Sequence, residues 1–310
     1  MKDSSNLLLR SSAALDFVTY LQNSDGSFTQ FIIYDEPPQD NPYSLTFHLQ
    51  ATSLLLSCSK TFGKGNLRTT ADKAYEFIKQ KYEFKHKNSA CIIDNNESIT
   101  MWNTLMAIIV LKQDKDATPY LNNLKHCICE NNIDAKYAPA TNEEEHDIKP
   151  PIGAMVLTFL EAYKKTKQSE YLDTALKIGE RLISKANMDS YDMWAMRFLH
   201  NATDNPNYKK QAQILLNNVN SIAIESMSSV VAAMVQRINI AWLDIFPENS
   251  ERCKNILEFQ KKCQDMRHGA FMKVPNQHET HLSDTIYNIY SMIEYLVEVE
   301  NREDLRIPVS

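Results

Sequence analysis

Apolar and polar residues alternate at helical spacing along most of the chain, and they do so in consecutive pairs of segments. In each pair, an amphipathic segment is followed by an irregular polar loop and then by a more apolar segment. The first members are expected at Leu8–Leu21, Thr69–Tyr82, Pro119–Glu130, Glu170–Ser184, Tyr208–Val219 and Ser250–Gln264. The second members are expected at Tyr43–Ser59, Ser98–Lys112, Ile152–Lys165, Tyr191–His200, Ser226–Ile240 and Asp284–Val297. The pattern therefore predicts about six helical hairpins.

The fourth pair shows how the two members of a hairpin differ. Glu170–Ser184 has a broad apolar stripe and an opposite charged face, which is typical of a helix with one side in water. Tyr191–His200 carries few charged groups, which is typical of a helix buried nearly all round. A single hairpin of this kind cannot bury its apolar face, so the hairpins are expected to pack in sequence as outer and inner helices. The sequence predicts an all-α fold, an α/α toroid with a central cavity at the N-terminal ends of its inner helices.

No Pro-, Gly- or Ser-rich linker interrupts this pattern, so residues 1–310 are expected to form a single toroid domain. Six glycines in the whole chain, and neither G-x-G-x-x-G nor a P-loop motif, leave dinucleotide and P-loop chemistry without support. A net charge of −6 without a basic stripe argues against nucleic acid as a partner.

The sequence also bears on location and redox state. No signal peptide and no apolar run long enough to span a membrane are recognised, so a cytoplasmic location is expected, with secretion by a route that leaves no N-terminal signal still open. The cysteines lack the spacing of a disulfide framework and are expected to be reduced core residues; they are Cys58, Cys91, Cys127, Cys129, Cys253 and Cys263.

Two short segments share a motif at matching points of the first and last hairpins. Gln22-Asn-Ser-Asp-Gly-Ser-Phe28 follows the first outer segment, and Gln264-Asp-Met-Arg-His-Gly-Ala-Phe271 ends the last one. Both resemble the Q-W repeat of terpenoid cyclases and protein prenyltransferases, with Phe in place of Trp. The resemblance implies a structural role, in which Gln ties helix ends together and the aromatic ring packs over the turn.

The last hairpin extends this resemblance. Gly269-Ala-Phe-Met-Lys-Val-Pro275, followed by Asp284-Thr-Ile-Tyr287, looks like the end of a prenyltransferase β-subunit. Where that family has a zinc-binding His, this chain has Asp284, so no zinc site is expected. The other families on this type of fold are carbohydrate-active, namely six-hairpin glycosidases, unsaturated glucuronyl hydrolases and sugar 2-epimerases. The acidic, aromatic-rich starts of the inner segments resemble these enzymes in style.

The strongest candidate site lies at the start of the fourth inner segment. Asp192 is flanked by Tyr191 and Trp194, so a carboxylate stands between two aromatic rings that could hold a sugar. A second interpretation is that Asp192 complements the helix dipole while the rings belong to the core.

The last hairpin contributes the second candidate site. His281 and Asp284 precede or open the last inner segment, with Tyr287 one turn further along, and both could act as general acid or base. Because His278 and His281 are expected in a loop, a metal site is not expected there, and no metal or cofactor is predicted elsewhere.

Further acidic and aromatic residues precede other inner segments. Asp147 follows a run of glutamates that is expected to be solvated, and Asp94 and Glu97 precede Trp102. Helix capping is the alternative role for such acids. Arg237 lies in an otherwise apolar segment, so it is expected either to pair with a core acid or to face an anionic ligand.

Taken together, these residues favour a carbohydrate-active enzyme, a hydrolase, lyase or epimerase acting on an oligosaccharide or uronic-acid-type sugar. Catalysis is expected from Asp192, Asp284, Asp147 or His281. The expected sugar-binding residues are Tyr191, Trp194, Trp102, Asp94, Glu97, Arg237 and Tyr287. Two alternatives stay open, an isoprenoid-handling protein and a non-catalytic toroid that binds a protein or glycan.

Overall fold

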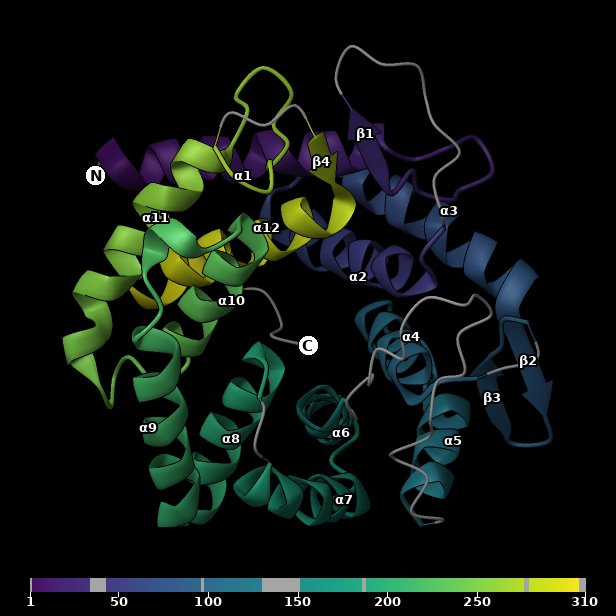
Figure 1. Ribbon diagram of the computed structural model, residues 1–310. Coiled ribbons are helices and arrows are strands. Elements are labelled where there is room, and N and C mark those ends of the chain that lie inside the picture. Colours follow the sequence, from purple (N-terminus) through teal and green to yellow (C-terminus); the bar gives the residue numbers. More distant parts are fainter. Residues whose placement is uncertain are drawn as a thin grey trace. The chain divides into compact units, whose positions relative to one another are not determined.

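A computed structural model describes residues 2–33, 43–95, 98–129, 151–185, 188–275 and 279–306. Within these ranges the chain is mostly helical, and twelve α-helices follow the predicted order of pairs (Figure 1). The first helices of the pairs are α1 (Lys2–Tyr20), α3 (Gly65–Tyr82), α5 (Thr118–Cys129), α7 (Ser169–Gly179), α9 (Pro206–Asn220) and α11 (Ser250–Cys263). Their partners are α2 (Leu45–Thr61), α4 (Thr100–Lys112), α6 (Ile152–Thr166), α8 (Ser190–Thr203), α10 (Ser229–Ile240) and α12 (Leu282–Glu298).

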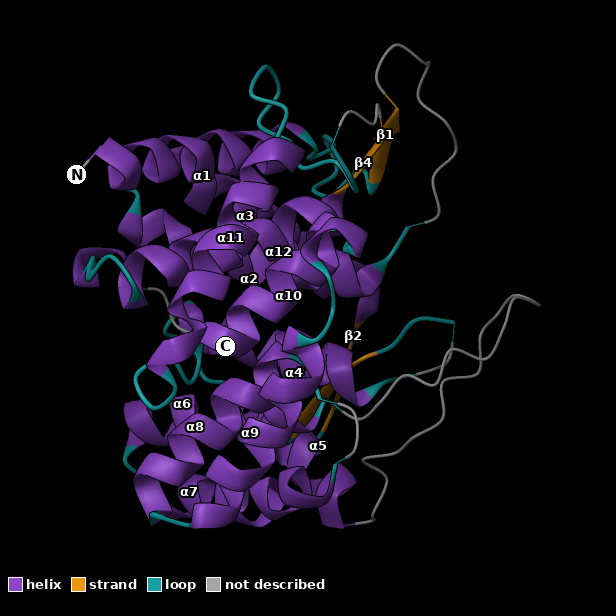
Figure 2. Cartoon of the chain, turned by 60° about the vertical axis from the view of Figure 1, so that its left-hand side comes forward, coloured by secondary structure: helices purple, strands orange, loops and turns teal. Residues whose placement is uncertain are grey.

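The described residues also include four short strands, which the sequence pattern did not predict. They form two antiparallel pairs (Figure 2). In one pair, β1 (Phe31–Ile33) lies beside β4 (Glu279–His281), with Phe31 opposite His281. In the other, β2 (Glu83–His86) lies beside β3 (Ser89–Ile92). Each pair is short enough to leave the helical packing as the main source of stability.

Contacts among the described residues group them into two compact units. Unit 1 contains those of residues 1–74 and 209–308, and unit 2 contains those of residues 75–208. The prediction of a single domain stays a prediction. No helix in the described ranges is both long and apolar enough to cross a bilayer.

Unit 1 is organised around α12, which is buried along most of its length. This helix packs against α10, α2 and α1, while α10 also packs against α11 (Figure 1). The N-terminal helix therefore lies against the last hairpin of the chain, although the two are far apart in sequence. The predicted division into exposed outer and buried inner helices is seen here, because α11 keeps charged residues on one side and α12 keeps few.

The two Q-x-G-x-F segments adopt the same local structure in unit 1. Gln22 and Phe28 form an isolated antiparallel bridge, and Gln264 and Phe271 form another. Both phenylalanine side chains are buried in the core. A turn of this kind ends the outer helix and packs an aromatic ring beneath the chain, as the resemblance implied.

The glutamine side chains connect neighbouring outer helices. Gln22 Nε2 donates a hydrogen bond to the carbonyl of Thr70 on α3, at 2.8 Å. Gln264 Nε2 donates to the carbonyl of Arg10 on α1, at 2.9 Å, and to that of Gly269, at 3.1 Å. Gly269 has a φ of +80°, and a Cβ there would lie 2.2 Å from the carbonyl oxygen of Ala13. We call these two links the glutamine clasps; the second ties the last hairpin to the first.

Unit 2 is organised around α6, which packs against α4, α7 and α8. Its neighbour α5 packs against α4 and β3. Some inner helices start at a polar cap, as in unit 2 at Asp189, whose side chain accepts the backbone N–H of Asp192. In unit 1, Ser44 and Ser228 do the same for α2 and α10.

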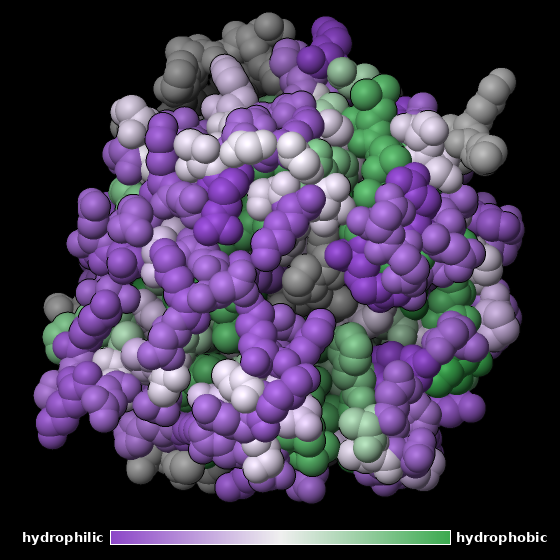
Figure 3. Space-filling model, turned by 180° about the vertical axis from the view of Figure 1, so that it is seen from behind, coloured by the Kyte–Doolittle hydropathy of each residue, from purple (hydrophilic) through white to green (hydrophobic). Residues whose placement is uncertain are grey.

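The surface of the protein follows from these amphipathic helices. On the face in Figure 3 the side chains are mostly hydrophilic, with smaller hydrophobic groups between them. Large apolar side chains that stay exposed include Tyr20, Phe84 and Phe198. Phe198 differs from the other two because it belongs to an inner helix, α8.

Candidate functional site

The first turn of α8 holds Asp192, the leading sequence candidate. Its carboxylate is buried and accepts hydrogen bonds on both oxygens. Oδ1 accepts the backbone N–H of Gly153, the second residue of α6, at 2.9 Å. Oδ2 accepts the backbone N–H of Asp189, at 3.0 Å, and the ammonium of Lys185, at 2.6 Å. Asp189 and Asp192 thus form a capping box, and Asp192 also joins the starts of α6 and α8.

The environment of Asp192 changes its acidity. Burial, followed by the nearby charge of Asp189, raises its pKa to about 6, and the ammonium of Lys185 opposes this shift. Gly153 is required at this contact, because a Cβ would lie 2.3 Å from the backbone nitrogen of Asp192. The catalytic role predicted for Asp192 stays a prediction, and its position also corresponds to the structural alternative considered from sequence.

An aromatic stripe runs along α8 from this point. Tyr191, Trp194 and Phe198 are spaced three and four residues apart, which places them on one face of the helix. The rings of Trp194 and Phe198 have centroids 6.1 Å apart. Tyr191 and Trp194 are nearly buried, whereas 40% of Phe198 is exposed. We call these three residues the α8 aromatic stripe. Sequence reasoning named the first two and missed Phe198, although its i+4 spacing from Trp194 was a usable signal.

The start of α4 is fixed by an asparagine. Asn103 Oδ1 accepts the backbone N–H of Ile92 in β3, at 2.8 Å, and its Nδ2 donates to Ser98 Oγ, at 2.9 Å. Trp102, a predicted sugar-binding residue, precedes Asn103 in the sequence, and its side chain is buried. Asp94 is partly buried in the preceding loop. The other two candidates in this region of the chain, Glu97 and Asp147, lie outside the described residues.

In unit 1, the candidates of the last hairpin lie at the start of α12. His281 is partly exposed at the residue preceding the helix, and Asp284 is buried in its first turn. The charge of Asp284, after burial, contributes to raising the pKa of Cys263 to about 12. Tyr287 is partly exposed, and its hydroxyl accepts a hydrogen bond from Gln50 Nε2 on α2, at 3.2 Å.

Arg237 pairs with an acid inside unit 1. Its Nε lies 3.0 Å and its Nη2 lies 2.8 Å from Oε1 of Glu294 on α12, and both side chains are buried. The guanidinium also lies over the ring of Tyr290, 5.0 Å from its centroid. Of the two roles expected from sequence, the pairing with a core acid is therefore observed. Removing either partner would leave a buried charge without its counter-ion.

Sequence reasoning missed a second polar pair near the start of α2. The hydroxyl of Tyr43 lies 2.8 Å from Nδ1 of His48, and Nε2 of His48 lies 3.2 Å from the carbonyl of Ala74. Because a carbonyl can only accept, Nε2 carries the proton and Nδ1 accepts from Tyr43. Burial lowers the pKa of His48 to about 4, so the ring is neutral near pH 7. The short spacing from Tyr43 to His48 was the only sequence signal.

The described candidates thus fall into two groups. One belongs to unit 2 and consists of Asp192 with the α8 aromatic stripe, together with Trp102 and Asp94 at the α4 start. The other belongs to unit 1 and consists of His281, Asp284 and Tyr287 at the α12 start, with the Tyr43–His48 pair near the α2 start. In the described ranges, no group of three or more His, Cys, Asp or Glu side chains is arranged to hold a metal ion.

Comparison with known proteins identifies the fold to which this chain is similar. No protein-family model matches the sequence, and no curated protein is similar to it. Solved structures do match. A family 76 α-mannanase from Bacteroides thetaiotaomicron is 12% identical, with a TM-score of 0.64, over 95% of this chain and 96% of that chain. A sugar epimerase from a ruminal bacterium is 13% identical, with a TM-score of 0.64, over 95% and 98%.

A third match carries a bound sugar. It is an inactive variant of an α-1,6-mannanase from a Salegentibacter species in complex with α-1,6-mannotetrose; it is 12% identical, with a TM-score of 0.61, over 91% of this chain and 96% of that chain. The protein therefore has the (α/α)6 toroid fold of six-hairpin glycosidases. This confirms the fold predicted from the hairpin pattern.

Proposed function

We propose that the protein is a carbohydrate-active enzyme that holds a sugar against the α8 aromatic stripe. The observation that carries the proposal is a row of three aromatic rings on an inner helix, ending in the partly exposed ring of Phe198. Aromatic rings combine a large apolar face with little conformational entropy to lose, which suits the C–H faces of sugar rings. Proteins of the same fold include mannanases and a sugar epimerase.

Asp192 has a positioning role in this proposal. Its carboxylate links the first turn of α8 to Gly153 and Lys185, so it fixes the position of the α8 aromatic stripe relative to α6. An acid or base group is proposed to come from a less enclosed residue of the same unit, Asp94, which precedes the inner helix α4. The catalytic roles expected from the sequence for His281, Asp284 and Asp147 stay predictions.

The carboxylates of this chain differ in one respect from those of the Salegentibacter mannanase. That enzyme was made inactive by replacing two consecutive aspartates. This sequence contains no two consecutive aspartates. We therefore propose a hydrolase, lyase or epimerase whose acid and base come from separate positions of the chain, rather than the same pair of acids performing the same hydrolysis.

Sugar binding tests the proposal. Tryptophan fluorescence and calorimetry would be recorded with mannooligosaccharides, other neutral oligosaccharides, uronic acids and prenyl diphosphates. A sugar should bind, and Phe198→Ala should weaken that binding about tenfold, the upper end of an aromatic contact of about 0.5–1.5 kcal/mol. Phe84→Ala, which removes an exposed ring from β2, is the matched control and should bind as the unmodified protein does.

The reaction is tested on the sugar that binds. Product analysis by chromatography and NMR would distinguish chain cleavage, elimination and epimerisation, and Asp94→Asn should strongly reduce turnover while leaving sugar binding in place. Selective binding of a prenyl diphosphate would contradict the proposal. So would the absence of any sugar binding, which would favour a non-catalytic protein.

A further inference from the structure

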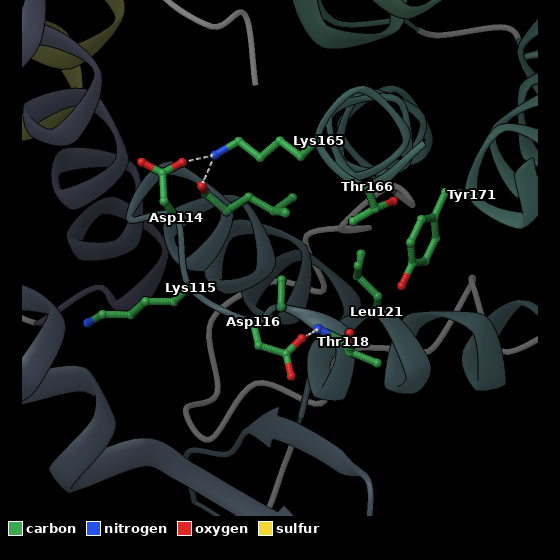
Figure 4. Close-up of a pocket in the computed structure, with 10 residues that line it drawn as sticks. Asp114, Lys115, Asp116, Thr118, Leu121, Lys165, Thr166 and Tyr171 are labelled. Carbon is green, nitrogen blue, oxygen red and sulfur yellow. Dashed lines mark hydrogen bonds and ion pairs between the residues drawn. The ribbon is translucent and has the colours of Figure 1, made fainter. Parts of the chain in front are cut away.

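Unit 2 contains a concave site that none of the sequence candidates lines. It is a pocket of about 350 Å³ between the C-terminal ends of α4 and α6 and the N-terminal ends of α5 and α7 (Figure 4). None of the three residues of the α8 aromatic stripe lines this pocket, so the two are separate sites. The volume lies at the low end of the range for ligand pockets, about 300–1,000 Å³.

The side chain of Tyr171 sets the chemistry of this pocket. The residue is only 2% exposed, its ring packs near Phe159, and the ammonium of Lys125 lies 4.7 Å from its centroid. Its hydroxyl points from α7 toward the side of the pocket that holds Leu121 and Thr118 (Figure 4). Within the described part of the chain, no group forms a hydrogen bond with this hydroxyl. The hydroxyl oxygen is not fully enclosed by protein atoms, so it is open to a hydrogen bond from a ligand or water in the pocket.

The charged groups of the pocket compensate one another. Lys165 forms an ion pair with Asp114, at 2.7 Å, and also donates to the carbonyl of Leu111 (Figure 4). Lys115 extends away from the pocket, with its ammonium 4.3 Å from the ring centroid of Tyr75. Asp116 accepts the backbone N–H of Thr118, at 2.9 Å. Because Lys165 is paired with Asp114 and the ammonium of Lys115 lies outside, the lining residues leave no cationic group in the pocket for an anionic ligand.

The remaining lining is apolar or carries hydroxyl groups. Leu111, Ala117 and Leu121 supply apolar surface, and Thr118 and Tyr171 supply hydroxyls. A few polar groups on an apolar wall are typical of sites that fix the orientation of a small molecule. We infer that this pocket is an accessory binding site for a small neutral polyhydroxy ligand, a monosaccharide or a polyol of similar size, which forms a hydrogen bond with the Tyr171 hydroxyl. The inference does not depend on the proposed function.

Ligand-observed NMR tests the inference on the full chain. Saturation transfer to neutral hexoses would be measured at millimolar concentration, in parallel with glucuronate and inorganic phosphate. Tyr171→Phe should weaken hexose binding about 3- to 10-fold, the value of one hydrogen bond. Tyr163→Phe, on the neighbouring helix α6, is the matched control and should leave binding unchanged. Thr118→Phe places a larger side chain at an exposed position of the rim and should block the pocket without disturbing the core.

The outcomes separate this site from the stripe. Hexose binding that persists in Phe198→Ala but is weakened in Tyr171→Phe and lost in Thr118→Phe supports the pocket. Hexose binding that is insensitive to both pocket variants overturns the inference, as does the absence of any hexose binding. Tighter binding of glucuronate or phosphate than of neutral hexose overturns the ligand class. Because Tyr171→Phe removes only a hydroxyl without a protein partner, we expect it to fold as the unmodified protein does.

Discussion

At the scale of single residues, Asp192 shows how burial and pairing oppose each other. Three protein groups donate to its carboxylate, yet burial raises its pKa from 3.8 to about 6. A carboxyl with a raised folded-state pKa contributes stability below pH 3.8 and loses that contribution as the pH rises through 6. The shift corresponds to about 3 kcal/mol.

The Asp192→Asn variant tests whether the stability contributed by Asp192 falls as the pH rises. Asparagine cannot ionise, so the free energy of unfolding of the unmodified protein, relative to that of the variant, should fall by up to about 3 kcal/mol between pH 4 and pH 7. Urea denaturation at several pH values measures it. Asp173→Asn, at an exposed position of α7, should give a difference that does not vary with pH. A difference that grows with pH would mean that Lys185 outweighs burial.

His48 gives the opposite dependence. Burial lowers its pKa from 6.5 to about 4, so its contribution to stability is full above pH 6.5 and is lost as the pH falls toward 4. The size of the effect is about 3 kcal/mol. We expect His48→Gln to remove this part of the acid sensitivity, measured as the change in urea midpoint between pH 7 and pH 4.5. His86→Gln, at an exposed position, should keep it; equal slopes for both variants would contradict the assignment.

At the scale of elements, the turn of the second glutamine clasp depends on Gly269. Three glycines form a graded series for Gly→Ala substitution. Gly269 combines a φ of +80° with a Cβ position 2.2 Å from the Ala13 carbonyl oxygen, Gly63 has a φ of +61° with open space, and Gly65 has open space and no positive φ. Thermal unfolding should rank the losses as Gly269→Ala above Gly63→Ala, each destabilising by more than about 1 kcal/mol, while Gly65→Ala should be neutral or stabilising. If Gly269→Ala and Gly63→Ala destabilise the protein equally, the close contact with the Ala13 carbonyl adds nothing to the cost of the positive φ.

The sequence predicted the helices well because their signal is local. All twelve expected segments correspond to helices, and the boundaries differ by a few residues, as at the start of α1. The β1–β4 pair was missed because it joins Phe31 to His281, and nothing within three-residue strands records a partner so distant in sequence. The β2–β3 pair was missed because each strand has only four residues.

The candidate site was predictable only in part, for a physical reason. A sequence shows that Asp192 opens a helix, but not that Lys185 and the Gly153 N–H enclose its carboxylate. It shows an arginine in an apolar segment, but not which acid pairs with it; here the acid is Glu294, on another helix. The pocket beside the Tyr171 hydroxyl could not be predicted from the sequence for the same reason, because only the packing of α4, α5, α6 and α7 defines it.

At the scale of the whole molecule, unit 1 is assembled from two distant stretches of chain and unit 2 from one continuous stretch. We therefore expect Gln264→Ala, which removes the clasp between α11 and α1, to increase amide hydrogen exchange in α1, α11 and α12. Exchange in α4–α8 should be unaffected under native conditions. Mass spectrometry of peptides from both units measures this, with Lys254→Ala, exposed on α11, as the control. A uniform increase across both units would show that they open together.

The second glutamine clasp also sets an order of events during synthesis. Gln264 follows Arg10 by 254 residues, so at about 5–20 residues per second the ribosome needs roughly 10–50 s to supply the partner of α1. Unit 2 emerges as one uninterrupted stretch within that interval. The apolar side of α1 is therefore without its final partner for much longer than any helix of unit 2, and during this interval the nascent chain is most exposed to chaperones and to aggregation.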